Sequence, residues 1–183
     1  MSDSMAGLKD SPSFSRLLTM FSNPVMGILS GMLLTAIIQS SSASVGILQA
    51  LAQTGIIPFS TAMPIVMGQN IGTTITPVIS SVNGNRDSKR VAVACVYIKM
   101  MGVIIFATVF YTVNMFVHFK FMQGHATAFS IALFHTTFNV ISTVFLMPFC
   151  SAIEKLTVIT IKGKSSKETD AFLTLDDRFL SIP

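Results

Sequence analysis

Two clusters of small polar residues interrupt the otherwise apolar first half of the chain. The first cluster is the run Gln-Ser-Ser-Ser-Ala-Ser that begins at Gln39, and the second is the run Gly-Gln-Asn-Ile-Gly-Thr-Thr that begins at Gly68. Their amide and hydroxyl groups can donate hydrogen bonds to an anion and can offer oxygen atoms to a small hard cation. Because neither cluster contains a carboxylate or a histidine, the pattern favours ion binding over a proton relay.

The sequence around these clusters is that of an integral membrane protein. Hydrophobic residues make up 51% of the chain and charged residues 11%, with a mean hydropathy of +0.68. Residues 17–85 contain no Asp, Glu, Lys, Arg or His, and a membrane-spanning helix needs roughly 20 such residues. The net charge of +4 falls in the flanking loops. It forms no basic stripe with interleaved aromatic residues, so nucleic acid is not an expected partner.

The first cluster separates two short apolar arms, residues 25–38 and 45–51. At about 1.5 Å per residue, neither arm is long enough to cross a hydrocarbon core of about 30 Å. The pattern predicts a re-entrant helical hairpin with the cluster at its tip, and a single kinked crossing is the alternative. The second cluster lies between apolar residues 62–67 and 75–82 and is followed by Pro77. Glycine, Asn and Thr are poor helix-interior residues, so this segment is predicted to be a broken transmembrane helix.

Two further segments, residues 91–117 and 127–149, are long and apolar enough to be ordinary transmembrane helices. The fold class is therefore an all-α integral membrane protein with a hairpin, a broken helix and two further crossings. With this topology the basic loop residues of the membrane segments fall on one face, which the distribution of Lys and Arg predicts to be cytoplasmic. These basic residues are Arg86, Lys89, Arg90, Lys155, Lys162 and Lys164. The hairpin would then open from outside, and the C-terminus would be cytoplasmic, in a multi-pass protein of the cell's inner (plasma) membrane.

Polar groups at bilayer depth must meet protein, water or a ligand, since unmet hydrogen bonds there are costly. Broken helices present free N–H groups that suit anions, together with carbonyls and hydroxyls that suit a small cation. A pair of such breaks predicts an anion and Na⁺ bound side by side. The alternative is that the small polar residues only allow helices to pack closely.

The two clusters, in their order and spacing, resemble the QSSS and (G/S)-x-N-I-G-T-T signatures of the type II sodium/phosphate cotransporters and their bacterial relatives. The resemblance is closest to the second of that family's two inverted repeats. It implies a sodium-dependent phosphate symporter, not an enzyme, with Na⁺ as coupling ion and no other cofactor. The residues it assigns to Na⁺ and phosphate binding, without separating the two ions, are Gln39, Ser40, Ser41, Ser42, Gln69, Asn70, Gly72, Thr73 and Thr74. Gly72 would permit the helix to unwind.

The resemblance also implies a domain organisation. Residues 1–22 would be a polar, amphipathic lead-in, residues 23–153 a membrane transport repeat, and residues 154–183 a cytoplasmic tail that looks like the start of a PhoU-like domain. The first repeat is absent, so the chain would be a fragment, or a half that needs the missing repeat or a second subunit. Other functions compatible with the pattern are a carrier for another anion and a membrane protein that reports phosphate status to a partner.

Two ionisable residues lie inside the predicted helices. Lys99 is near the middle of the third segment, at about the place where the resemblance implies an Asn. It could act in transport, or it could snorkel or pair within the bundle. His135 precedes a Thr-Thr-Phe-Asn stretch and could sense pH or line a cavity, or it could be a packed, hydrogen-bonded histidine.

Overall fold

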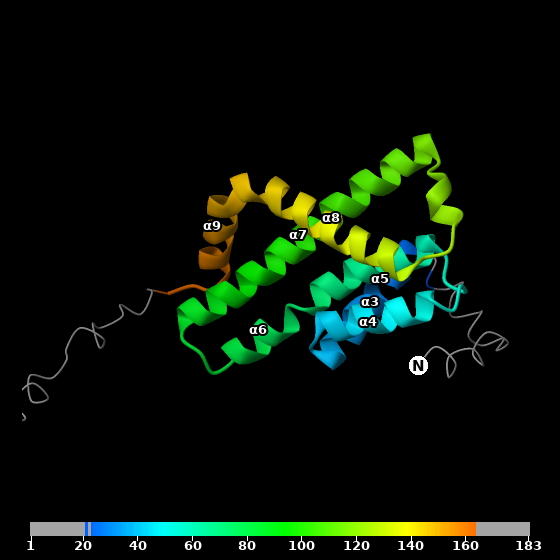
Figure 1. Ribbon diagram of the computed structural model, residues 1–183. Coiled ribbons are helices and arrows are strands. Elements are labelled where there is room, and N and C mark those ends of the chain that lie inside the picture. The colour runs from blue at the N-terminus through cyan, green and yellow to red at the C-terminus, as the bar shows by residue number, and fades with distance from the viewer. Residues whose placement is uncertain (1–20, 22, 164–183) are drawn as a thin grey trace, which may run out of the picture.

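The computed structural model describes Phe21 and residues 23–163, and this part of the chain is mostly helical (Figure 1). The only β-type pairing among these residues is an isolated bridge between Pro58 and His125. The all-helical class predicted from the sequence is therefore confirmed. The predicted lead-in, except for Phe21, and residues 164–183 of the predicted cytoplasmic tail (154–183) lie outside the described residues.

Two short helices, α3 (Pro24–Ile38) and α4 (Ser41–Ala52), meet at the first polar cluster. The side chain of Asn23 caps α3 by accepting from the Val25 N–H at 3.0 Å. The helix ends at Gln39, which adopts the left-handed conformation with φ 57°. Ser40 then caps α4, because its hydroxyl accepts from the Ala43 N–H at 3.3 Å. The first two residues of the cluster thus form the turn between the helices, and the other four belong to α4.

The next two helices, α5 (Phe59–Gly72) and α6 (Ile75–Ser81), are separated only by Thr73 and Thr74. Pro77 accounts for the position of this break, because it has no N–H to give to the carbonyl four residues earlier, at Thr73. The break is narrower than the polar run from Gly68 to Thr74, since helix α5 continues through Gly72.

Helices α3 and α5 run parallel and touch through glycines at four-residue spacing, Gly27 and Gly31 on α3 and Gly68 and Gly72 on α5. A Cβ added at Gly31 would lie 2.0 Å from the carbonyl oxygen of Ile65, and one at Gly68 would lie 1.9 Å from that of Ile28. The two backbones therefore approach each other as closely as small-residue motifs allow in membrane helices. Gly72 belongs to this contact and has no left-handed backbone.

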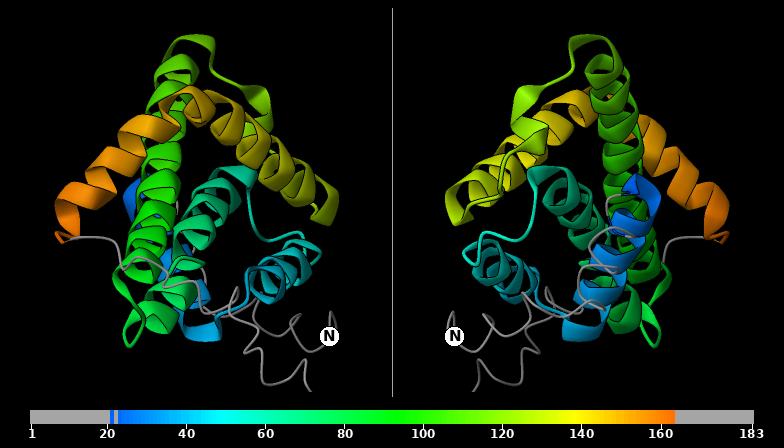
Figure 2. Two further views of the ribbon diagram at one scale, coloured as in Figure 1. Left: turned by 90° about the vertical axis from the view of Figure 1, so that its left-hand side faces the viewer. Right: turned by 90° about the vertical axis from the view of Figure 1, so that its right-hand side faces the viewer.

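The long helix α7 (Arg86–Val117) and helix α8 (Ala128–Leu146) cross above this layer (Figure 1). A short 3₁₀ turn, η2 (Met147–Phe149), leads from α8 into α9 (Cys150–Thr160). Two stretches, Arg86–Val117 and Ala128–Thr160, are long and apolar enough to cross a membrane. Helix α9 turns back against the first half of α7, where the Tyr97 and Thr160 hydroxyls lie 2.8 Å apart, on the side away from α4 (Figure 2). The predicted boundary between residues 153 and 154 falls inside α9.

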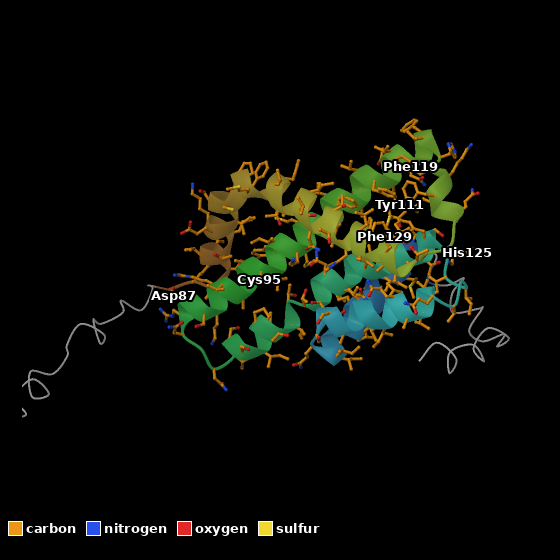
Figure 3. All side chains as sticks on the ribbon, in the orientation of Figure 1. Asp87, Cys95, Tyr111, Phe119, His125 and Phe129 are labelled. Carbon is orange, nitrogen blue, oxygen red and sulfur yellow. The ribbon has the colours of Figure 1, made fainter. Side chains whose placement is uncertain are left out.

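Hydrogen bonds between segments that are distant in the sequence define two ends of the molecule. At one end, the Ala126 N–H donates to the carbonyl of Ile57 at 2.8 Å. At the other end, the Arg90 guanidinium donates to the carbonyl of Gly163 at 2.6 Å. Figure 3 shows Asp87 and His125 at these opposite ends. The openings of the α3–α4 hairpin and of the α7–α8 loop therefore share one end, and the basic start of α7 lies at the other.

The buried core surrounds α5, in which every residue from 61 to 70 is buried. The outer surface is strongly apolar, with Phe116 79% exposed on α7 and Phe129 75% exposed on α8. Exposed apolar area of this extent is unusual for a protein that faces water on all sides. It is the surface expected of helices that face lipid or further transmembrane helices.

Candidate functional site

A polar cavity of about 530 Å³ lies where the start of α4, the end of α5 and the middles of α7 and α8 meet. Both sequence clusters contribute to its wall, although they lie on separate helices. The residues that line the cavity are Ser41, Asn70, Thr73, Lys99, His135, Thr136, Asn139 and Val140.

The side-chain amide of Asn139 connects three helices at this cavity. Its Oδ1 accepts a hydrogen bond from Asn70 Nδ2 of α5 at 3.1 Å and another from Lys99 Nζ of α7 at 3.2 Å. Its Nδ2 donates to the backbone carbonyl of His135 at 2.8 Å. Because a carbonyl can only accept, this last bond fixes which way the amide of Asn139 points. The acceptor oxygen therefore faces Asn70 and Lys99.

A second network, formed by Thr35, Ser44 and Gln69, joins the hairpin to α5. Gln69 Nε2 donates to both the carbonyl and the hydroxyl of Ser44 at 3.0 Å, and the Thr35 hydroxyl donates to that of Ser44 at 2.9 Å. All three side chains are buried, with Gln69 only 1% exposed. Gln69 Oε1 is buried with no hydrogen-bond partner among the residues that the structure describes.

The side chains of Gln69 and Asn70 therefore face different surroundings, although the two residues are adjacent in the sequence. Successive residues of an α-helix point about 100° apart, so Asn70 lies at the cavity while Gln69 meets the buried hairpin. The side-chain carbonyl oxygen of Gln69, Oε1, is the kind of neutral hard ligand that binds a small cation. The two residues divide the second cluster into a cavity side and a buried side.

At the hairpin tip, only Ser41 of the first cluster lines the cavity. Gln39 is exposed, and the Ser40 hydroxyl lies 3.3 Å from that of Ser42 in an exposed contact. The first N–H groups of a helix have no partner within the helix. Since Ser41 is the first residue of α4, the positive end of that helix lies at the cavity wall.

The helix break contributes Thr73, whereas Thr74 is turned away from the cavity. The Thr73 hydroxyl donates to the carbonyl of Asn70, and the Thr74 hydroxyl donates to that of Ile71 at 2.8 Å. Thr74 is buried and does not line the cavity. Gly72 lies at the α3–α5 contact, so the structure gives it a packing role.

The charges of the cavity wall suit an anion. Its ionisable side chains are Lys99 and His135, and the wall contains no Asp or Glu. Within the described part of the chain, no group of three or more His, Cys, Asp or Glu residues could hold a metal ion. A cation here would therefore be held by neutral oxygen atoms and by the anion itself.

Three residues of these networks were not among the predicted site residues: Thr35, Ser44 and Asn139. Ser44 ends the first polar cluster, so its position in the sequence could have identified it. Asn139 is 69 residues from Asn70 in the sequence, and only the packing of α8 against α5 brings the two together. The sequence left open whether His135 lines a cavity or is a packed histidine, and the structure places it at the cavity wall.

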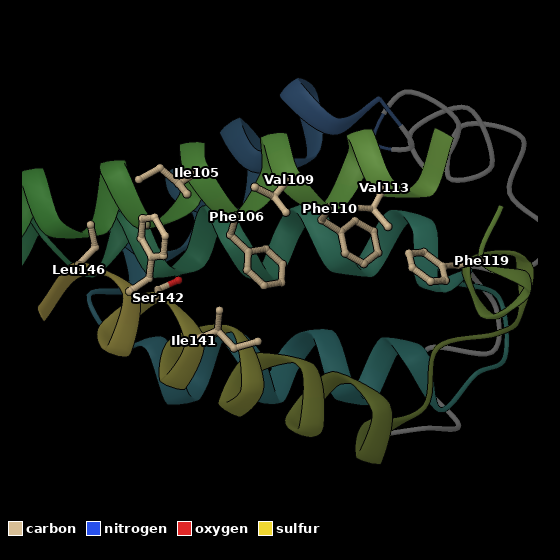
Figure 4. Close-up of a pocket in the computed structure, with 11 residues that line it drawn as sticks. Ile105, Phe106, Val109, Phe110, Val113, Phe119, Ile141, Ser142 and Leu146 are labelled. Atoms are coloured by element: carbon tan, nitrogen blue, oxygen red, sulfur yellow. The ribbon is translucent and has the colours of Figure 1, made fainter. Parts of the chain in front are cut away.

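A second hollow, of about 370 Å³, separates α7 from α8 farther along both helices (Figure 4). It is lined by aromatic side chains, among them Phe106, Phe110 and Phe119, by aliphatic side chains, and by Ser142. Such a surface offers an ion almost no compensation for its lost hydration. The polar cavity is therefore the better candidate for the functional site.

Membrane-length helices with exposed apolar faces, arranged around a polar cavity, are features typical of an integral membrane transporter. A model of the Na⁺/Pi-cotransporter family matches residues 1–142. The chain belongs to this family, which is a family of transporters and not of enzymes. The family predicted from the two polar clusters is confirmed.

Known relatives come from bacteria and mammals. The chain is 36% identical over 137 residues to YqeW of Bacillus subtilis, an uncharacterized protein, covering 75% of this chain and 44% of YqeW. It is 47% identical over 58 residues to rat sodium-dependent phosphate transport protein 2A, covering 32% of this chain and 9% of the rat protein. It is 38% identical over 78 residues to human sodium-dependent phosphate transport protein 2B, covering 42% and 11% respectively. The chain thus spans less than half the length of these relatives. No solved structure matches the chain.

Proposed function

We propose that this protein takes part in secondary active transport, as a symporter that moves inorganic phosphate together with Na⁺ through the polar cavity. The observation that supports this most directly is the wall of the cavity itself. Hydrogen-bond donors from three helices converge there with Lys99, and no carboxylate opposes an incoming anion. No bond is made or broken, so the work of the protein is binding and alternating access.

In this proposal the anion occupies the cavity between the start of α4 and the helix break. Ser41 would offer its hydroxyl and N–H, and Asn70 its second amide proton. Thr73, whose hydroxyl donates to the Asn70 carbonyl, would line the site beside them. The helix N-terminus of α4 would add the favourable dipole found at many phosphate sites. Gln39, Ser40 and Ser42, which lie at the exposed tip, would meet the ion as it enters or leaves.

Na⁺ would bind through neutral oxygen atoms on the buried side of the same break. Gln69 Oε1 is buried without a partner among the described residues, and Pro77 leaves the Thr73 carbonyl without a helical N–H. Amide and peptide oxygens of this kind hold Na⁺ in broken-helix transporters. The two ions would then lie close together, and the charge of each would partly neutralise the charge of the other.

The membrane arrangement that fits this function is a re-entrant hairpin of α3 and α4 beside a broken crossing made by α5 and α6. The hairpin and the α7–α8 loop open at the same end, and Arg90 marks the other end. Lys and Arg favour the cytoplasmic face, so we place the start of α7 and the end of α9 in the cytoplasm of a cell-membrane protein.

A complete transport path would need more than this one set of helices. The match covers 44% of YqeW, and α3, α7 and α8 leave many large apolar side chains exposed. We propose that a further repeat, or a second subunit, supplies the remaining wall. Transport is therefore best tested on the full-length protein that contains this sequence.

The test is phosphate uptake into proteoliposomes with and without an inward Na⁺ gradient. Uptake should require Na⁺, and Asn70→Ala and Gln39→Ala should each reduce it. Asn83→Ala, which removes an exposed amide from the turn before α7, is the matched control and should transport normally. Uptake that ignores Na⁺, or that survives both site substitutions, would contradict the proposal. Stronger competition by another oxyanion than by unlabelled phosphate would indicate a different substrate.

A further inference from the structure

Lys99 places a cationic group inside the apolar length of α7 and at the wall of the polar cavity. The residue lies 13 positions after the start of this helix of 32 residues, within a stretch long and apolar enough to cross a membrane. Its Nζ donates to Asn139 Oδ1 at 3.2 Å, so it is turned inward towards α8 and not outward to lipid.

No carboxylate in the described residues balances this charge. The salt bridge that the structure shows there joins Arg90 to Asp87 at 3.1 Å, at the end of the molecule. Asn139 is neutral, and the cavity wall contains no Asp or Glu. An unbalanced charge at membrane depth is unfavourable, so the site gains most when an anion enters beside Lys99.

The remaining donors of Lys99 are available for such an anion. An ammonium group has three N–H donors, and Asn139 accepts one of them. Ser41, Asn70 and Thr73 line the same cavity, so an oxyanion could contact Lys99 and these neutral groups together.

We propose that the Lys99 ammonium is a built-in cation of the anion site and takes the place of one coupling Na⁺. This proposal rests on the proposed symport and deepens it. A phosphate ion needs compensating positive charge to enter a site of low dielectric. A tethered ammonium supplies part of that charge without being transported, so fewer Na⁺ ions need to accompany each phosphate.

The experiment compares Na⁺ titrations of phosphate binding and uptake by the full-length protein with those of Lys99→Gln, which keeps a hydrogen-bond donor but removes the charge. Because a neighbouring unit charge in a partly buried site strengthens binding substantially, phosphate affinity at fixed Na⁺ should fall about tenfold or more. The dependence on Na⁺ should become steeper, and the charge carried per phosphate should increase, because an additional Na⁺ takes the place of the ammonium.

Two comparison variants separate charge from structure. Lys99→Arg should recover most of the lost affinity and the original Na⁺ slope, whereas Lys120→Gln, in the exposed loop after α7, should leave both unchanged. A loss of affinity that Lys99→Arg does not recover would show a packing role and overturn the proposal. A second readout uses unmodified protein, which should retain measurable phosphate binding in Na⁺-free buffer, and complete absence of that binding would also overturn it.

Failure of this inference is distinguishable from failure of the symport itself. If the unmodified protein shows no Na⁺-dependent phosphate uptake, the proposed function falls and this inference falls with it. If it transports phosphate and Lys99→Gln has the same Na⁺ slope, only the role of Lys99 as a substitute cation is overturned.

Discussion

Asn70 of α5 donates a hydrogen bond from Nδ2 to Oδ1 of Asn139 on α8, at 3.1 Å. This bond joins the segment just before the helix break to a crossing helix 69 residues later in the chain. Since Asn139 also accepts from Lys99 and donates to the carbonyl of His135, a single amide fixes three parts of the cavity wall.

Replacing Asn139 by Ala should therefore weaken phosphate binding without unfolding the protein. The change leaves the donors of Asn70 and Lys99 without their acceptor, and each lost partner of this kind corresponds to about 1–3 kcal/mol. We expect the KM for phosphate to rise about 10- to 100-fold in uptake measurements. The matched control is Asn114→Ala, which removes an amide that caps the loop after α7 by accepting from the Phe119 N–H. An unchanged KM in Asn139→Ala would show that the amide does not organise the site.

The contact between α3 and α5 predicts a strong effect on stability at Gly68. An added Cβ would lie 1.9 Å from the Ile28 carbonyl oxygen, which is backbone and can move only if the helices separate. Gly68→Ala should therefore destabilise the protein by about 2–3 kcal/mol, as overpacking does, and lower its melting temperature in detergent.

The control for this prediction is Gly46→Ala on α4, where an added Cβ meets nothing within 4 Å. Alanine is a better helix former than glycine by up to about 1 kcal/mol, so this variant should be at least as stable as the unmodified protein. Equal melting temperatures for the two variants would contradict the close α3–α5 contact.

The sequence was sufficient to locate the two interruptions, because their physical causes are local. Gln39 and Ser40 form the turn between α3 and α4, since a left-handed residue and a helix-capping serine are short-range features. Pro77 limits the second interruption to Thr73 and Thr74, while Gly68 and Gly72 remain helical. Composition alone gave a wider break, because glycine favours both unwinding and close packing and only the neighbouring helix decides between them.

The division of labour within the site could not be predicted, because it depends on tertiary packing. Whether Gln69 or Asn70 faces the cavity is set by the rotation of α5 against α3. Likewise, no short-range pattern connects Asn139 to Asn70. The residue types were recognised from the sequence, but their assignment to a cavity side and a buried side required the arrangement of α3, α5 and α8.

Gln69 should affect the Na⁺ dependence of transport more than the affinity for phosphate. Its Nε2 holds Ser44, and its Oε1 is buried with no partner in the part of the chain described. Gln69→Leu removes this oxygen at similar volume, so the half-saturating Na⁺ concentration should rise about tenfold, equivalent to roughly 1.4 kcal/mol. The Ser44 carbonyl also loses the hydrogen bond from Gln69, and the Ser44 hydroxyl keeps only the one from Thr35, which should lower stability by about 1–3 kcal/mol.

Gln49→Leu is the matched control for that substitution. Gln49 also joins α4 to another helix, through a hydrogen bond of 3.2 Å from Nε2 to the Ala128 carbonyl, but it does not line the cavity. It should show a small loss of stability and an unchanged Na⁺ requirement. If both variants shift the Na⁺ requirement equally, Gln69 acts through general packing and not as a ligand.

A substitution that closes the break between α5 and α6 should keep or raise the stability of the protein but reduce its transport. Pro77→Ala restores an N–H opposite the Thr73 carbonyl and removes a residue about 3 kcal/mol less favourable than Ala in a helix interior. The melting temperature should therefore stay the same or rise. Uptake should nevertheless fall at least about tenfold, equivalent to roughly 1.4 kcal/mol, because the Thr73 carbonyl would then accept a helical hydrogen bond and would no longer be available to an ion.

Pro148→Ala, at the exposed bend between α8 and α9, makes the same chemical change away from the cavity and should transport normally. Full uptake by a stabilised Pro77→Ala protein would show that transport does not need the break.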